Sequence, residues 1–347
     1  MLRIELLPAA YGDCILVSYG SGTIRHVLID AGITPTWVES LRPHLEKQGI
    51  ERLELFVLTH IDADHIAGAI PMLEDETLPV EIGELWFNGW DHLPKRILSV
   101  KQGERFSTLI RERGIPWNAR FKGRAVCLTE GDLPVHELDG GLRLILLSPT
   151  EEKLERLARV WKKEIDRHFL GDASGTPRRP RFLARDPTTS TDVASLAATK
   201  FRPDTSIPNG SSIALLAEYG ESSVLLAADA HASVLTRSLV RLLRERDLNR
   251  LALGAFKVPH HGSRGNTNLG LIELLDCNRY LVSCNGDVHN LPDNEAIGRI
   301  IQHGGSQPWL QFNYHCPRTR CWDDTALRER YRYRTTYGSN GYLHVNL

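Results

Sequence analysis

The chain has 347 residues, of which 41% are hydrophobic, an ordinary fraction for a protein with a packed core. Its 42 basic and 43 acidic side chains nearly cancel, which excludes an overall positive field that would attract nucleic acid. No apolar run reaches the roughly 18–20 residues that cross a bilayer, the first residues predict a strand rather than a signal peptide, and the cysteines are scattered. We therefore expect a cytoplasmic protein with reduced thiols and no membrane partner.

Short apolar runs alternate with helix-like stretches along the chain, which predicts an α/β protein with layered sheets. The runs expected to form strands are residues 2–6, 14–19, 26–30, 53–58, 82–87, 142–147, 213–218, 223–228, 252–258 and 279–284.

The most informative segment follows the apolar run 53–58. It contains His60, Asp62, Asp64 and His65, between the predicted strand and a helix that begins near His65. In an extended loop, side chains two apart point the same way, so His60 and Asp62 reach one ion and Asp64 and His65 turn toward a second. Such ligands hold pairs of divalent cations about 3.5–4 Å apart in hydrolytic sites. The alternative, that Asp62 or Asp64 caps the helix, explains only one of the two acids.

Three other predicted strands also end in acids or histidines. Asp30 ends the run 26–30, Asp229 follows 223–228, and His260 and His261 follow 252–258. A strand with a polar turn explains any one case, but four such ends predict a convergent site in which Asp229 bridges both ions. His260, directly at the strand end, is the preferred ligand, and His261 is the candidate to support it or to protonate a leaving group. The reverse assignment of the two histidines stays open.

Residues 150–208 interrupt the strand pattern and predict an insertion in a single domain that spans 1–347. Apolar residues at three- and four-residue steps predict an amphipathic helix from Glu151 to Phe169, and a Pro-, Ser- and Arg-rich stretch behind it predicts a long loop. Arginine pairs well with phosphate oxygens, so the loop supplies candidate substrate contacts, with a solvated linker as the alternative. These candidates are Arg178, Arg179 and Arg181.

These motifs, in this order, resemble the metallo-β-lactamase superfamily. The chain is similar within it to the hydrolase domain of the competence DNA-uptake protein ComEC and its soluble relatives. Asp62 replaces the usual second histidine of the metal motif, the late motif is His260-His261-Gly262-Ser263, and Gly12-Asp13-Cys14 resembles a Gly-Asp-Ala or Gly-Asp-Ser segment. The likeness covers residues 1 to about 292 and is poor around 93–208.

The resemblance implies a four-layered αββα sandwich with two divalent metal ions in a groove at one edge. The implied ligands are His60, Asp62, Asp64, His65, Asp229 and His260, and Asp64 also takes a catalytic role with the water that the ions activate. A further histidine, which completes the first site in many relatives, has no equivalent. Asn209 and Ser212 occupy its place and resemble an Asn-x-x-Ser element that contacts substrate. Carboxylate in place of imidazole makes the site harder, so Mn²⁺ competes with Zn²⁺.

Two further residues are candidates beside the ions. Ser263 can hold a phosphate through its hydroxyl group, although a simple Gly-Ser turn is an equal alternative. His289 resembles the late His-Pro element of the ComEC branch and is a candidate proton donor.

Three functions follow from these residues. The first is a phosphodiesterase or nuclease that acts on DNA. The second is a hydrolase of a small ester, lactam or nucleotide-like molecule, which the balanced charge favours. The third is a metal-stabilised binding module without catalysis, which the missing histidine suggests.

Overall fold

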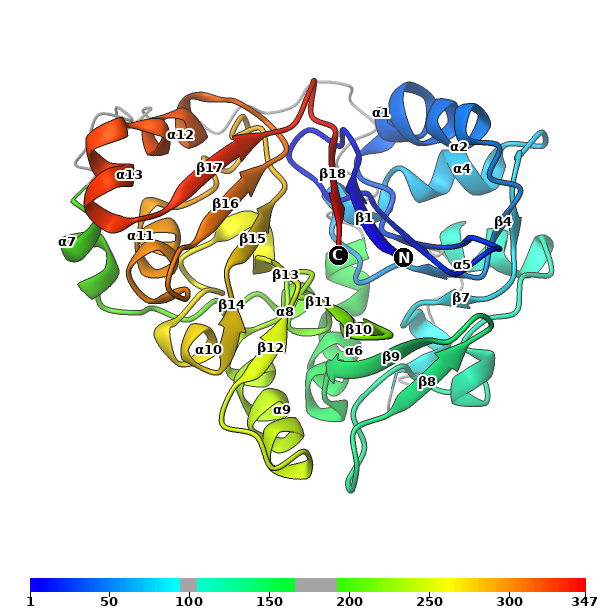
Figure 1. Ribbon diagram of the computed structural model, residues 1–347. Helices are drawn as coiled ribbons and strands as arrows, with labels where there is room; N and C mark the ends of the chain where they lie inside the picture. Colours follow the sequence, from blue (N-terminus) through cyan, green and yellow to red (C-terminus); the bar gives the residue numbers. More distant parts are fainter. Residues whose placement is uncertain (94–104, 166–191) are drawn as a thin grey trace.

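The structure is a computed structural model that describes residues 1–93, 105–165 and 192–347 (Figure 1). Two mixed sheets form its centre. In spatial order, the first sheet contains β18 (Leu343–Asn346), β1 (Leu2–Leu6), β2 (Ile15–Tyr19), β3 (Arg25–Ile29), β5 (Leu55–Val57) and β7 (Leu85–Trp86). The second contains β17 (Arg334–Tyr337), β16 (Trp309–Phe312), β15 (Arg279–Val282), β13 (Ala255–Lys257), β11 (Ser222–Leu226), β10 (Ala214–Tyr219), β9 (Leu142–Ser148) and β8 (Val135–Leu138).

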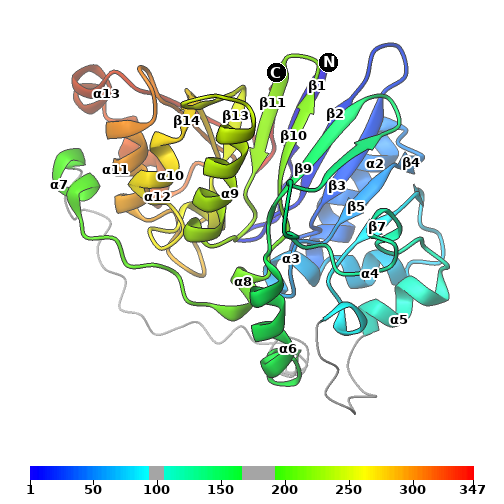
Figure 2. The same ribbon diagram turned by 90° about the horizontal axis from the view of Figure 1, so that it is seen from below.

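Helices cover the outer face of each sheet, so the chain forms four layers (Figure 2). Against the first sheet lie α1 (Thr34–Thr36), a π-helical turn (Trp37–Leu41), α2 (Arg42–Gln48), α4 (Ala69–Glu74) and α5 (Arg105–Glu112). Against the second lie α7 (Val193–Ala198), α9 (Ala232–Glu245), α10 (Leu269–Glu273), α11 (Asn294–His303) and α13 (Thr325–Tyr331), with α12 (Pro317–Arg320) beside them. This arrangement confirms the expected αββα sandwich.

Each central strand is apolar on both of its faces. In β2, Val17 points into the core between the sheets, whereas Leu16 packs against the helices. In β11, Leu226 points into the core between the sheets, and Leu225 packs against the helices. Because both faces are buried, these strands appear in the sequence as continuous apolar runs rather than as an alternation.

All ten predicted strands are present, but three of the runs are divided. The runs 53–58, 82–87 and 252–258 each begin in a short strand, which pairs outside the main sheets, and then enter a main sheet. The short strands are β4 (Arg52–Leu53), which pairs with β6 (Glu81–Ile82), and β12 (Leu251–Leu253), which pairs with β14 (Leu275–Cys277). No apolar run in the sequence predicted β8, β14 or the last three strands.

The helix expected after His65 is present as two pieces, α3 (Ala63–Ile66) and α4. The amphipathic helix of the predicted insertion is α6 (Glu151–Ile165), and the rest of its predicted length and the arginine-rich loop lie outside the described residues. A short helix, α8 (Ile207–Gly210), follows. No helix in the described part of the chain is long and apolar enough to span a bilayer.

Candidate metal centre

Parallel strands of both sheets deliver polar residues to one edge of the sandwich. In the first sheet β3 and β5 run parallel, and in the second β11, β13 and β15 do. Open α/β sheets commonly bind ligands beyond the carboxyl ends of such strands. The residues that follow these ends are Asp30, His60, Asp229, His260, His261 and Ser283.

The loop that carries His60 to His65 is held by neighbouring backbone and by Asp30. The carbonyl oxygen of Thr59 accepts a hydrogen bond of 3.0 Å from the N–H of Ile213, at the start of β10, which ties the loop to the second sheet. Asp62 stands at the N-terminal cap of α3, but its side chain makes no capping hydrogen bond. The capping alternative therefore has no support in the geometry.

Asp229 lies at the centre of the cluster and is 1% exposed. Its Oδ2 atom is 3.5 Å from Nε2 of His65, 3.6 Å from Nε2 of His260 and 3.9 Å from Nε2 of His60. Its Oδ1 atom is 3.9 Å from Nε2 of His261. One carboxylate thus faces four imidazoles, which is the arrangement expected of a bridging ligand.

Asp64 and Asp62 complete two neighbouring ligand groups. Asp64 Oδ2 lies 3.3 Å from Nε2 of His261 and 3.8 Å from Nε2 of His65. Asp62 Oδ2 lies 3.7 Å from Nε2 of His60. The ligand atoms of Asp64, His65 and His261 lie within 4.8 Å of one another, as do those of His60, His65 and Asp229.

Each of the four histidines uses its other ring nitrogen to contact a protein acceptor. When Nδ1 donates its hydrogen outward, Nε2 keeps a lone pair that points into the cluster, and this is how metal-binding histidines are usually oriented. The four contacts are His60 Nδ1 to Thr59 Oγ1 at 2.9 Å, His65 Nδ1 to Asp30 Oδ2 at 2.7 Å, His260 Nδ1 to Asn266 Oδ1 at 2.9 Å, and His261 Nδ1 to the Ser283 carbonyl oxygen at 2.9 Å.

The inward-facing atoms fit a pair of cations. Within the described residues, the buried Nε2 atoms of His60, His65 and His261 have no hydrogen-bond partner, and neither has Asp229 Oδ1. Two ligands that each lie about 2.0–2.1 Å from a tetrahedral cation are about 3.3 Å apart. The spacings of 3.3–3.9 Å from the imidazoles to Asp64 and Asp229 are close to this value.

The acidic side chains of the cluster favour a positive charge at its centre. Burial opposes the protonation of His65, but Asp229, Asp30 and Asp64 outweigh it and hold its pKa well above the usual range. For His260, burial is likewise outweighed, by Asp229 and Asp204, and the pKa rises to about 10. Burial disfavours the charged form of Asp64, yet the neighbouring His65 and His261 lower its pKa to about 2. The carboxylates therefore stay ionised at neutral pH, as metal ligands must be.

The turn at His260 and His261 differs from the one expected from the sequence. Both residues have left-handed backbone angles, with φ of 47° and 53°, and Gly262 follows at φ 87°. Such conformations are unfavourable for residues with a side chain and often mark functional positions. The turn brings His261 to Asp64 and Asp229, so the geometry favours His261 for the position that the sequence assigned to His260. His260 faces only the Oδ2 side of Asp229, beside His60.

The predicted substrate residues occupy different surroundings. Asn209 is buried behind His260, with Nδ2 2.7 Å from Asp204 Oδ2 and 3.3 Å from His260 Nδ1, and Ser212 is fully buried. Ser263 accepts a hydrogen bond from the N–H of Gly265 at 3.2 Å, which is the contact of a local turn. Arg178, Arg179 and Arg181 lie outside the described residues.

His289 lies at the rim of the cluster. Its side chain is exposed, its ring centroid is 6.1 Å from that of Tyr11, and Asp64 and His261 are among the groups that act electrostatically on it. This position is compatible with a proton donor that faces the substrate.

Three residues close to the centre were not selected from the sequence. Asp204 accepts hydrogen bonds from Asn209 and Asn266 and lies 3.6 Å from His260 Nδ1. Asp13 and Lys257 form a buried ion pair of 2.7 Å next to His261. A usable signal existed for Lys257, because a charged residue inside the apolar run 252–258 is unusual in a buried strand.

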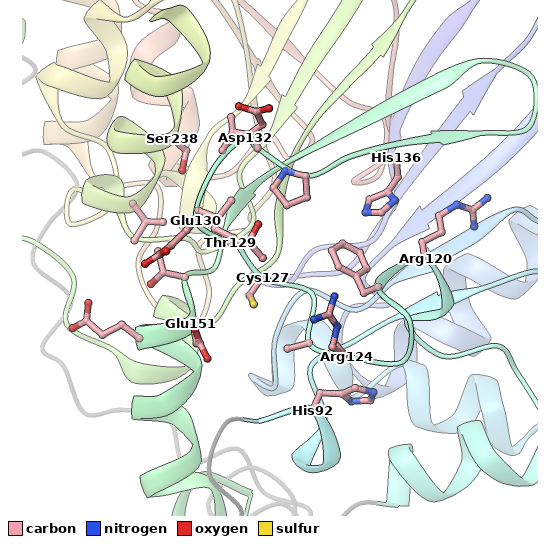
Figure 3. A pocket seen from close by; sticks show the side chains of 18 of the residues that line it. His92, Arg120, Arg124, Cys127, Thr129, Glu130, Asp132, His136, Glu151 and Ser238 are labelled. Carbon is pink, nitrogen blue, oxygen red and sulfur yellow. The ribbon is translucent and has the colours of Figure 1, made fainter. Parts of the chain in front are cut away.

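A cavity of about 1020 Å³ lies beside α6 and α9, and none of the cluster residues lines it (Figure 3). Lys153 of α6 donates a hydrogen bond to His231, two residues after Asp229, while Thr150 and Glu151 of the same segment line the cavity. The charged side chains that line it are balanced: Asp91, Glu130, Asp132, Glu151, Glu152, Arg120, Lys122, Arg124, Arg237 and Arg241.

We expect Asp30→Asn to weaken binding of the divalent cations by about 10–100-fold, because partners of ligand residues typically contribute that much. Asp30 accepts hydrogen bonds from the N–H and hydroxyl of Thr59 as well as from His65, so an amide at this position cannot satisfy all three donors. Titration of the metal-free protein against a chromophoric chelator measures the change. Unaltered affinity would show that Asp30 is dispensable for orienting His65.

Comparison with known proteins agrees with this fold. The model of the metallo-β-lactamase superfamily matches residues 8–286. No curated protein matches. Among solved structures, a mutant of the β-hydroxylase CmlA aligns at 12% sequence identity with a TM-score of 0.41, and the alignment covers 99% of this chain and 54% of that protein. The diiron β-hydroxylase CmlA from Streptomyces venezuelae aligns at 11% sequence identity with a TM-score of 0.40 and the same coverage. The chain thus spans about half the length of these proteins.

A diphosphatase of the PhnP family aligns at 11% identity and TM-score 0.36, covering 100% of this chain and 98% of its own. The family match extends over most of the sequence and includes every residue of the metal cluster described above. The chain therefore belongs to the metallo-β-lactamase superfamily.

Proposed function

We propose that this protein is a hydrolase that uses two divalent cations, Zn²⁺ or Mn²⁺, and cleaves phosphodiester bonds, with DNA as the substrate. The superfamily consists typically of metal-dependent hydrolases, and its fold often binds two ions. The observation that carries the proposal is the convergence of four imidazole Nε2 atoms on the carboxylates of Asp229 and Asp64.

The ligand residues divide between two positions. Asp64, His65 and His261 would hold the second cation, and Asp229 would serve both. His60 and Asp62 would hold the first cation. His260 would take the place of the histidine that the sequence lacks, because its Nε2 atom lies near the same Asp229 oxygen as that of His60.

Bound cations would supply an activated water and would stabilise negative charge on the oxygens of the attacked phosphate. The chain's own residues do the rest. Asp30, Thr59 and Ser283 fix the orientation of the ligand rings, and Asp64 keeps its carboxylate beside the position of the nucleophile. His289, on the exposed rim, protonates the leaving oxygen.

Two features of the sequence support DNA as the substrate. The His-His-Gly-Ser and Gly-Asp-Cys motifs are similar to those of the ComEC hydrolase domain, and the arginines at 178, 179 and 181 suit phosphate contacts. Asn209 would then support His260 from behind.

A second candidate, hydrolysis of a small ester, lactam or nucleotide-like molecule, is favoured by the cavity beside α6 and α9. Its five acidic and five basic side chains create no net field for a polyanion, and its volume of about 1020 Å³ suits a small molecule. This observation is independent of the metal centre.

Incubation with circular DNA, linear DNA and small generic phosphodiesters, with Mn²⁺, Zn²⁺ or chelator, tests the proposal. We expect metal-dependent cleavage of DNA that is lost in Asp64→Ala, since this change removes a carboxylate ligand that faces both His65 and His261. Cleavage of circular DNA would identify an endonuclease. Turnover of small diesters without DNA cleavage would favour the second candidate.

Elemental analysis of the reconstituted protein separates both candidates from a binding module without catalysis. We expect about two ions per chain. Fewer than about one ion per chain would favour the non-catalytic module.

A further inference from the structure

Lys257 and Asp13 are a fully buried ion pair at the inner side of the metal cluster. Lys257 is 0% and Asp13 1% exposed, and Nζ of the lysine lies 2.7 Å from Oδ2 of the aspartate. The two residues are 244 positions apart and come from opposite sheets, because Asp13 precedes β2 and Lys257 ends β13. Lys257 also lies 3.4 Å from the carbonyl oxygen of Val258.

A simple structural role explains this pair poorly. Taking two charges out of water costs more than their attraction usually returns, and an apolar pair of similar volume often stabilises a core better. The surrounding strands are apolar, so two hydrophobic side chains could link the sheets at this point. The position of the pair relative to the metal ligands is more informative.

The free oxygen of Asp13 lies beside the outward-facing Nδ1 atom of His261, a residue of the proposed second cation site. Oδ1 of Asp13 is 3.6 Å from Nδ1 of His261 and has no hydrogen-bond partner within the described residues. Ligand atoms of Asp13, Asp229 and His261 all lie within 4.8 Å of one another. The ammonium group of Lys257, 2.7 Å from Oδ2, compensates the charge of the Asp13 carboxylate in this buried position.

We propose that Lys257 is a positioning residue that holds Asp13 as a carboxylate kept off the metal. Bound to the ammonium group through Oδ2, Asp13 supports His261 from behind instead of becoming a third acidic ligand of the second cation. Lys257 thereby sets the number of carboxylates around that ion. This inference rests on the proposed two-cation centre.

The two partners should therefore have opposite effects on metal affinity. Lys257→Met frees the charge of Asp13, which we expect to tighten binding of Mn²⁺ about tenfold or more, with a smaller gain for Zn²⁺, because a harder ligand set favours Mn²⁺. Asp13→Asn retains the shape but removes the charge, and we expect binding of both ions to weaken about 10–100-fold. In Asp13→Asn/Lys257→Met the gain should vanish, since it requires the carboxylate.

Competition of the metal-free variants with a chromophoric chelator measures these affinities. Thermal unfolding with and without Mn²⁺ gives a second readout, in which the rise in Tm caused by Mn²⁺ should be larger for Lys257→Met than for the wild type. Lys47→Met, which removes an exposed lysine of α2, serves as the matched control and should change neither quantity.

The outcomes separate this inference from the proposed function. A wild type that binds no divalent cation would overturn the metal centre itself. If the wild type binds, parallel weakening in Lys257→Met and Asp13→Asn, with no further loss in the double variant, would show an ion pair of structural importance only and would overturn the inference. Should Lys257→Met not fold, Lys257→Gln replaces it, and failure of both to fold with saturating Mn²⁺ also counts against the inference.

Discussion

Asp229→Asn should lower the rate of metal-dependent hydrolysis by at least about 10³-fold, equivalent to about 4 kcal/mol of lost transition-state stabilisation. The amide has almost the shape of the carboxylate but no charge. Asp229 faces the Nε2 atoms of His60, His65, His260 and His261 within 3.9 Å, so it is placed to serve both ions. The metal content should also fall below that of the wild type.

Two measurements check this result. Elemental analysis gives the ions per chain, and single-turnover rates with saturating Mn²⁺ separate loss of metal from loss of chemistry. Asp276→Asn removes an exposed carboxylate from β14 and should leave both unchanged. An Asp229→Asn protein with full metal content and wild-type rate would refute the bridging role.

Gly12→Ala should reduce the free energy of unfolding by about 3 kcal/mol, near the upper end of overpacking effects. A Cβ atom at Gly12 would lie 2.0 Å from the carbonyl oxygen of Asp64, and backbone at this point cannot rotate away as a side chain does. Asp13 also donates its N–H to that oxygen at 3.2 Å. The displacement reaches Asp64 directly, so we expect weaker binding of the second cation as well.

Chemical denaturation of the metal-free protein measures the first effect, and chelator competition measures the second. Gly270→Ala is the matched control, because its Cβ would meet no atom within 4 Å and alanine favours the surrounding helix α10 by up to about 1 kcal/mol. Equal stability of the two variants would mean that the loop of Asp64 moves without cost to accommodate a methyl group at position 12.

The sequence was sufficient to predict the layered fold and most of the cluster, for a local reason. Strands buried on both faces leave long apolar runs, and the polar residues at their ends stand out against them. His60, Asp62, Asp64 and His65 lie within six residues, so one loop determines most of the geometry. One of the missed strands, β17, has only half-exposed or exposed side chains and no such contrast.

The parts that could not be predicted depend on conformation or on distant contacts. The order of His260 and His261 was assigned from strand direction, whereas both residues adopt left-handed angles that a propensity argument disfavours. The pairing of Asp13 with Lys257 joins the two sheets, and no local pattern specifies it. Asp204 lies in a stretch without regular structure, and its role depends on His260.

The divided strands pair in the same pattern in the N-terminal and C-terminal parts of the chain. In one part β4 pairs in parallel with β6 and β5 with β7, and in the other β12 pairs in parallel with β14 and β13 with β15. The chain thus contains the same architectural unit twice, and the ligand set is divided between the units: His60 to His65 belong to the first, and Asp229, His260 and His261 to the second. Fragments produced separately should recover cation affinity only when they reassociate.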